Sequence, residues 1–332
     1  MKLPPDTESM ITILVLTAVV LQVIVPPGLL LWLWRRTVST RLQWLAGVAV
    51  VVSTIAVLSL VLPWSTVPWY VRHLYAVAAV GIAAATWPRV RHVAWFDTLG
   101  RRRWVTLATH AALALLMAAV AVRAVVGMAV PDSSRIDLAC PFPSGVYLVV
   151  SGGNSLLLNS HLVTLEPIAR YAPWRGQSYG VDLVRLDGWG RRSEGLLPAD
   201  PVRYHIHGQV VTAPCSGTVI SSVSNRPDMP VPVRDPDRSQ LAGNHVLLDC
   251  DGIEVLLAHL LHGSVRVSRG DRVMTGETVG VIGNSGNTTE PHLHVSAQRR
   301  APGDALIGGE PMWIAIDGRY LVRNDRLDCD GH

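Results

Sequence analysis

Two histidines, His292 and His294, stand one residue apart in the stretch SGNTTEPHLHVSAQ, residues 285–298. The stretch reads as a short strand behind a turn of Gly, Asn, Ser and Thr. Side chains at positions i and i+2 of a strand point to the same face, so both imidazoles share one surface. Imidazole binds metals and transfers protons near neutral pH. The pair therefore indicates a metal or proton-transfer site, or else a polar strand face with two hydrogen-bonded histidines.

Three further residues stand where they could join such a site. His259 lies in LLAHLLHG and His161 in LLLNSHLV. Asp182 lies in the otherwise apolar strand GVDLV, and a buried carboxylate needs a partner or a metal ion. Imidazole and carboxylate groups are both zinc ligands. Together with the histidine pair, these residues could supply the ligands of a zinc site.

The motif order resembles that of the lysostaphin/LytM-type zinc metallopeptidases. Residues 242–295 carry a G-N-x-V-x-x-D strand, an A-H-L strand, a G-D-x-V-x-x-G-x-x-V-G turn, and then G-N-S-G before P-H-L-H. Residues 208–219, GQVVTAPCSGTV, resemble the family's upstream hairpin. The resemblance covers residues 145–297. It implies an all-β, zinc-dependent peptidase that cuts peptide bonds in peptidoglycan stems or cross-bridges.

The resemblance implies roles for four of these residues. Asp182 and His294 would be zinc ligands. His259 and His292 would flank the bound water, where they could transfer its proton or donate a hydrogen bond to the developing oxyanion. Zinc itself would polarise the carbonyl and bring bound water to a pKa of about 7.

The chain departs from the family's usual H-x-G-x-D pattern at the first ligand. That ligand should stand four residues before the aspartate, where this chain has Ser178, and a serine hydroxyl is a poor zinc ligand. The segment from SGGNSLLLNSHLV to GQSYGVDL resembles a branch of the family that carries N-x-H upstream. We therefore expect His161 to be the third ligand, with Asn159 as a helper.

The remaining histidines of this half fit the motifs less well. His205 and His207 form a second i, i+2 pair in YHIHG, but they precede the hairpin where the family has no ligand. We expect both to be exposed rim residues. His245, His262 and His332 match no ligand position, so we assign them no chemistry.

Charge and hydrophobicity divide the chain near residue 130. Residues 1–130 contain 11 Lys and Arg against 3 Asp and Glu, a net charge of +8, whereas the remainder contains 18 against 22, a net charge of −4. The excess arginine of the first part lies in short loops between long apolar runs. Membrane orientation explains this better than nucleic-acid binding, which we do not expect.

The apolar runs predict an N-terminal module of four transmembrane helices, over about 10–34, 42–63, 68–87 and 104–130. The loop 35–41 has three arginines and 88–103 has five, while 62–70 has none. Arginine-rich loops tend to remain cytoplasmic, so both termini should lie outside a cytoplasmic membrane. His110 and Arg123 fall in or near the last span, and we expect them to be structural, the first hydrogen-bonded between helices and the second reaching the interface.

Residues 131–332 predict a second, all-β and mainly antiparallel domain outside the membrane. Short β-type runs such as GVYLVV and NHVLLDC alternate with turn clusters such as SGGN and SRGD. All four cysteines lie here and lack the C-x-x-C spacing of a structural zinc site. Four cysteines permit three disulfide pairings. Our interpretation is Cys215 with Cys250, and Cys140 with Cys329, because the latter two flank the domain, with free core thiols as the alternative.

The sequence thus predicts a membrane-anchored zinc endopeptidase that acts on peptidoglycan peptides. Because Ser178 replaces the usual ligand, a non-catalytic peptidoglycan-binding or hydrolase-regulating domain is the alternative. A third hypothesis makes the membrane module a sensor or transporter with an unknown partner. No carboxylate occurs inside any predicted span, which argues against transport.

Overall fold

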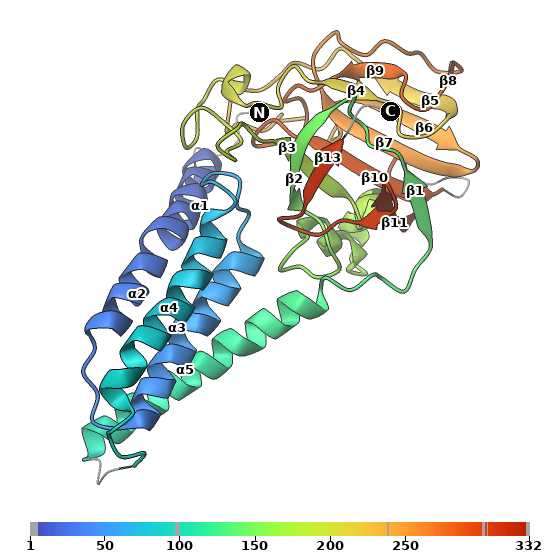
Figure 1. The fold of residues 1–332 in the computed structure, drawn as a ribbon. Coiled ribbons are helices and arrows are strands. Elements are labelled where there is room, and N and C mark those ends of the chain that lie inside the picture. The colour runs from blue at the N-terminus through green and yellow to red at the C-terminus, as the bar shows by residue number, and fades with distance from the viewer. Residues whose placement is uncertain (1–5, 97–99, 238, 301–302, 304, 330–332) are drawn as a thin grey trace. The chain divides into compact units, whose positions relative to one another are not determined.

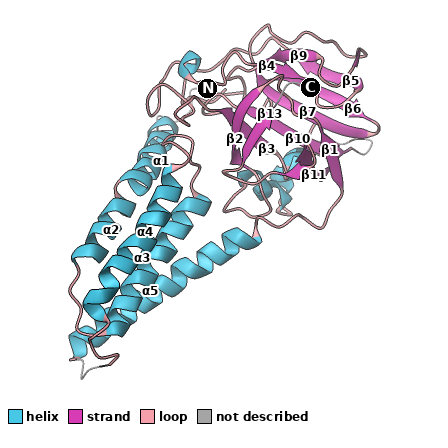
Figure 2. Ribbon diagram, viewed as in Figure 1, coloured by secondary structure: helices cyan, strands magenta, loops and turns pink. Residues whose placement is uncertain are grey.

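The structure, a computed structural model, describes residues 6–96, 100–237, 239–300, 303 and 305–329. The chain divides into two compact units. The helical unit comprises residues 15–126, and the β unit contains residues 127–332 together with the start of the first helix. Figure 1 gives the element labels, and Figure 2 separates the helices from the strands by colour.

The described helices cover all four apolar segments of the sequence. They are α1 (Asp6–Val23), α2 (Val25–Arg35), α3 (Arg41–Val61), α4 (Val71–Val90) and α5 (Arg101–Val126). The first predicted segment therefore holds two helices that meet at Ile24. Pro26 and Pro27 cause this interruption because each lacks the N–H that would donate to the preceding turn. The side chain of Thr40 caps α3 by accepting a hydrogen bond from Gln43 N at 3.2 Å.

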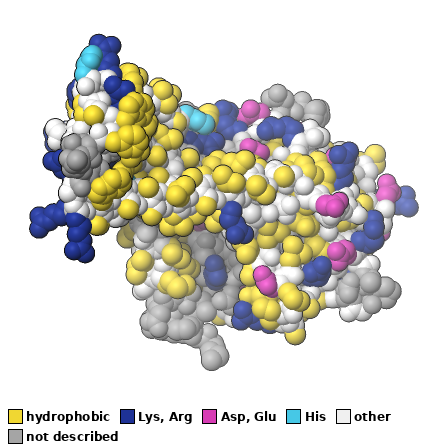
Figure 3. Space-filling model, turned by 90° about the horizontal axis from the view of Figure 1, so that it is seen from below, with side chains coloured by type: hydrophobic (Ala, Val, Ile, Leu, Met, Phe, Trp, Pro, Cys, Tyr) yellow, Lys and Arg dark blue, Asp and Glu magenta, His cyan; other side chains and the backbone are white. Residues whose placement is uncertain are grey.

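Three helical segments among the described residues are long and apolar enough to cross a membrane: Ser9–Arg35, Arg41–Val61 and Arg101–Val126. The fourth predicted span, α4, is rich in alanine, contains Arg72 and Arg89, and is not among these three segments. Large apolar side chains such as Val77 and Leu115 point outward. Figure 3 shows hydrophobic side chains over much of the visible helical surface, with Lys and Arg side chains at one edge of it.

The β unit is mainly antiparallel, as predicted. Its larger sheet has the strand order β13-β2-β3-β10-β7-β6-β5-β8, with β11 pairing β1, β10 and β12, and β4 pairs β9 separately. Only the pairing of β1 with β11 is parallel among the described strands. The strands are β1 (Arg135–Leu138), β2 (Gly145–Ser151), β3 (Val181–Arg185), β4 (Val210–Thr212), β5 (Gly217–Val223), β6 (Asn244–Cys250), β7 (Ile253–Leu260), β8 (Arg272–Val273), β9 (Thr278–Val281), β10 (Leu293–Arg299), β11 (Glu310–Ile316), β12 (Arg319–Tyr320) and β13 (Arg326–Cys329).

Alternation along β10 separates the core from the face that carries the candidate site. Leu293, Val295 and Ala297 enter the main hydrophobic core. His294 falls between them and therefore points to the opposite face. The 3₁₀ helices η1 (Ser160–Leu165) and η2 (Ala169–Gln177) connect β2 to β3, while η3 (Pro201–Arg203) follows β3.

Both proposed disulfide bonds are present. Cys140 bonds Cys329 across 189 residues, and Cys215 bonds Cys250 across 35 residues. The β-type run VRVS, residues 265–268, does not form a strand. Arg266 N donates to Val279 O at 3.0 Å, but the segment does not continue this pairing as a ladder among the described residues.

Candidate metal centre

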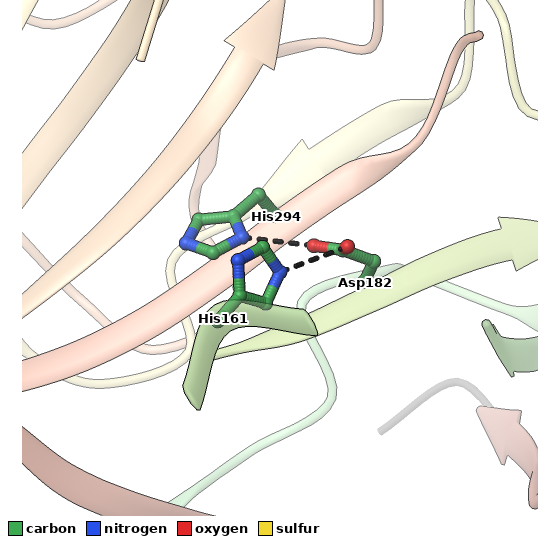
Figure 4. Close-up of side chains that lie close together, drawn as sticks. All are labelled: His161, Asp182 and His294. Carbon is green, nitrogen blue, oxygen red and sulfur yellow. Dashed lines mark hydrogen bonds and ion pairs between the residues drawn. The ribbon is translucent and has the colours of Figure 1, made fainter. Parts of the chain in front are cut away.

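Strand register places Asp182 and His294 side by side. β10 lies between β3 and β7, and His294 is paired with Asp182 on one side and with Ala258 on the other. Directly opposed residues on neighbouring strands hold their Cβ atoms about 5 Å apart. As Figure 4 shows, the His294 ring lies against the carboxylate, with Nδ1 donating to Asp182 Oδ1 at 2.8 Å.

His161 reaches the same carboxylate from η1. Its Nε2 donates to Asp182 Oδ2 at 2.9 Å, so the two histidines bind different oxygens (Figure 4). Asn159 caps η1 by accepting from His161 N at 3.0 Å. Its amide nitrogen in turn donates to Gly180 O at 3.2 Å, two residues before the aspartate. Asn159 thus ties the η1 backbone to the residues just before β3.

These three side chains form a group that fits a zinc ion. One potential ligand atom from each lies within 4.8 Å of the others. His294 Nε2 is buried and has no hydrogen-bond partner among the described residues, so the group is incomplete without a further partner. Two imidazoles and one carboxylate also match the donor set of a three-ligand catalytic zinc site with an open position.

His259 reaches the site through a β-bulge. Strict alternation would place it on the core face with Val255 and Leu257. Instead, the pairing of β6 with β7 skips one residue, since Asn244 pairs with Leu260 and the next residue with Ala258. His259 takes the left-handed conformation at this bulge, with φ +67°. Its ring centroid consequently lies 6.1 Å from that of His294.

The two flanking histidines present the same ring edge to the site. His259 Nδ1 donates to Ser285 O at 2.9 Å, and His292 Nδ1 donates to Glu290 O at 2.9 Å. Each bond fixes the ring hydrogen on Nδ1 and leaves the lone pair on Nε2. His292 Nε2 lies 3.7 Å from Asp182 Oδ1. The ring centroids of His259 and His292 are 4.7 Å apart.

Burial and mutual contact set the charge of the group. Burial alone would raise the pKa of Asp182, but the rings of His161 and His292 and the hydrogen bonds from His161 and His294 hold it well below its usual range. Burial, then the neighbouring His292 and His294, lowers the pKa of His259 far below its ordinary value. Burial also lowers the pKa of His294 despite its bond to Asp182. The centre therefore combines an anionic carboxylate with two imidazoles, those of His259 and His294, that favour the neutral form. A deprotonated carboxylate and a neutral imidazole are the forms that bind a metal ion.

Ser178 lies outside the group. Its hydroxyl donates to Arg175 O at 2.6 Å and contacts Thr164 Oγ1 at 2.7 Å, and its side chain is fully buried. Ser178 therefore does not take the place of the usual histidine ligand. The imidazole of His161, which comes from η1, lies next to Asp182 and His294 instead.

A cavity of about 720 Å³ opens over the group. Besides the five site residues, its wall includes Arg170, Trp174 and Arg234, which sequence reasoning did not identify. Trp174 and Arg170 belong to η2, which lies between the two predicted site motifs in the sequence. The arginine and aromatic residues of this segment were the signal that could have indicated a ligand-binding wall. The wall therefore offers both a flat apolar surface and positive charge to a ligand.

The other histidines lie elsewhere. His205 and His207 are half-buried rather than exposed, so that part of the prediction was wrong: His205 Nε2 packs 3.6 Å from Asp187. His245 is buried, with Nδ1 donating to Gly243 O, and His262 is exposed. None of these four belongs to the group of His161, Asp182 and His294, and His332 lies outside the described residues.

Residues 202–305 match the model for Peptidase family M23. The match confirms the motif resemblance for this part of the chain and includes His259, His292 and His294. It begins after His161 and Asp182, which the fold alone brings to the site. No curated protein sequence matches the chain.

Several solved structures are similar to parts of the chain. A variant catalytic domain of the prophage-encoded M23 protein EnpA from Enterococcus faecalis is 20% identical, over 38% of this chain and 71% of that one, with a TM-score of 0.25. Lysostaphin from Staphylococcus simulans is 21% identical, over 37% and 38%, with a TM-score of 0.24. A zinc-containing peptidase from Vibrio cholerae is 19% identical, over 45% and 28%, with a TM-score of 0.23. The chain thus spans well under half of the last two proteins.

Proposed function

We propose that this protein is a membrane-anchored zinc endopeptidase that hydrolyses peptide bonds of peptidoglycan stems or cross-bridges. The observation that carries the proposal is the convergence of His161, Asp182 and His294 within 4.8 Å, from η1, β3 and β10. The family match over residues 202–305 supports peptidase chemistry. The three apolar helical segments support anchoring in a membrane. The arginine-rich loops 35–41 and 88–103 favour a position of the β unit outside the cytoplasmic membrane.

In this proposal His161, Asp182 and His294 hold the zinc ion. Bound zinc supplies a Lewis acid that polarises the scissile carbonyl and makes a water molecule acidic near neutral pH. His259 and His292 present Nε2 lone pairs, so either can accept a proton from the attacking water. The protonated ring can then deliver that proton to the leaving amine or stabilise the oxyanion through a hydrogen bond. Hydrolysis by an activated water needs no covalent intermediate with a side chain of the site.

Release of peptide fragments from purified peptidoglycan tests the proposal. We expect the full chain in detergent micelles to release fragments with new amino termini, detected by mass spectrometry. His294→Ala and prior treatment with a chelator should both abolish release. His262→Ala is the matched control, because His262 is exposed and outside the group. Wild-type protein that contains zinc yet releases nothing would contradict peptidase function.

The same assay separates the regulatory alternative. A non-catalytic domain would bind peptidoglycan without releasing fragments, and its binding would survive His294→Ala. Ser178 motivated that alternative, but the position of His161 supports the enzyme instead. In this proposal the imidazole of His161 is the third zinc ligand, because a serine hydroxyl is a poor ligand for zinc.

A further inference from the structure

An ion pair between a buried arginine and a half-buried glutamate lies next to the site and takes no part in the chemistry described above. Arg192, only 3% exposed at its side chain, donates from Nε to Glu290 Oε2 at 2.8 Å, and its Nη2 lies 2.7 Å from the same oxygen. The pair joins the segment after β3 to the turn before β10, 98 residues apart in the chain. Tyr204 packs beside the guanidinium, 5.8 Å from its ring centroid, and is itself buried.

The anchored residue is the one that holds His292. The backbone carbonyl of Glu290 accepts the His292 Nδ1 hydrogen at 2.9 Å and the Thr288 hydroxyl at 2.7 Å. Thr288 Oγ1 also lies 3.1 Å from Asn284 Oδ1. Glu290 is therefore bonded to Arg192 through its side chain and to His292 through its carbonyl.

Stability alone is a weak reason for burying this pair. Desolvating two charges costs about as much as their attraction returns, and apolar replacements of similar size are often neutral. The adjacent Arg191 shows the ordinary arrangement, since it pairs with Asp187 in a turn and is 44% exposed. An arginine that is buried in such a pair is better explained by what the pair positions.

We propose that Arg192 is a positioning residue for His292. Its ion pair with Glu290 holds the turn so that the Glu290 carbonyl keeps the hydrogen of His292 on Nδ1 and Nε2 faces the cavity. The catalytic consequence rests on the proposed peptidase function, whereas the tautomer does not. Loss of the pair lets the turn shift, so that the ring is no longer held in one tautomer or one orientation. Small displacements of this kind lower a rate by about tenfold to a hundredfold.

Nuclear magnetic resonance of the full chain in micelles, with ¹⁵N in the histidine rings, tests the positioning directly. His292→Gln assigns the signal. In the wild type we expect His292 to show a single tautomer with its hydrogen on Nδ1. Arg192→Met should give a mixture of tautomers, while the neighbouring control Arg191→Met should leave the His292 signals unchanged. A single, unaltered tautomer in folded Arg192→Met would overturn the proposal.

Kinetics of the zinc-loaded variants gives the second readout. Arg192→Met should lower kcat by at least tenfold, with KM within threefold and zinc content unchanged, and Arg192→Lys should recover part of the loss.

If Arg192→Met fails to fold, the double variant Arg192→Met/Glu290→Leu, which leaves no unpaired buried charge, decides by the same tautomer and kcat criteria. A wild-type kcat in either folded variant would overturn the proposal. An inactive wild type would contradict the peptidase function, and the tautomer measurement would still decide the positioning.

Discussion

At the residue scale, one carboxylate organises the site, because both oxygens of Asp182 are used by imidazoles from different elements. Removing one imidazole should therefore remove a ligand without unfolding the strands. We predict that His161→Ala lowers zinc affinity by more than about a hundredfold, since even outer partners of metal ligands contribute 10–100-fold. Competition with a fluorescent zinc chelator measures this.

Ser178→Ala is the matched control for that prediction. It removes the buried bonds to Arg175 O and Thr164 and should reduce the free energy of unfolding by about 1–2 kcal/mol. Zinc affinity should stay close to that of the wild type, because Ser178 lies outside the group. Zinc loss in Ser178→Ala with full affinity in His161→Ala would reverse the assignment of the third ligand.

The protonation of His259 gives a second prediction at this scale. An ordinary imidazole with a pKa of about 6.5 is mostly protonated at pH 6, whereas the lowered pKa of His259 keeps it neutral there. The pKa of His259 is lower in the folded chain than in the unfolded chain. Its contribution to the free energy of unfolding is therefore fully present above pH 6.5 and is lost as the pH falls through the folded pKa. Titration of ring-labelled histidines in the zinc-free chain checks this. A midpoint for His259 at or above 6.5 would be inconsistent with its burial.

The site residues could be predicted from sequence to different degrees. His294, Asp182 and His259 stand in ordered motifs, and the N-x-H pattern indicated His161. The bulge that turns His259 towards the site was not predictable, because alternation alone places it in the core. Arg192 was not predictable either, since its partner Glu290 is 98 residues away and no local spacing connects them.

At the element scale, the start of β3 must come very close to β10. A Cβ on Gly180 would lie 2.6 Å from His294 Cε1 and 2.9 Å from Gln177 O. We predict that Gly180→Ala displaces the His294 ring, destabilises the fold by about 1–3 kcal/mol and lowers zinc affinity about tenfold or more. Gly188→Ala is the control, since a Cβ there meets nothing within 4 Å. Thermal unfolding and zinc competition should separate the two variants, and equal zinc affinity would contradict this packing account.

Most strands before residue 300 could be predicted, because alternating β-branched runs end at glycine-rich turns. β11, β12 and β13 were not predicted. β11 reads EPMWIAI, and it is buried on both faces for most of its length, so it shows little alternation. Its parallel pairing with β1 brings together segments at opposite ends of the β unit, which no local pattern indicates.

At the scale of the whole molecule, the proposed side of the β unit depends on whether α4 crosses the membrane, because α4 is not among the three segments that are long and apolar enough to do so. If α4 crosses the membrane, the loops on either side of it lie on opposite sides. All four native cysteines are in disulfides, so single cysteines can report this. We predict that Thr66→Cys reacts with an impermeant thiol reagent added outside cells, whereas His92→Cys reacts only after permeabilisation. Labelling of both from outside would mean that α4 does not cross.

The central claim is that one zinc ion is held by His161, Asp182 and His294. Anomalous diffraction at the zinc absorption edge, from crystals of the full chain purified without chelator, tests this most directly. The account predicts a single strong peak in contact with all three side chains and adjacent to His259 and His292. A well-ordered site without an anomalous peak, or a peak at another cluster such as His205 and His207, would contradict it.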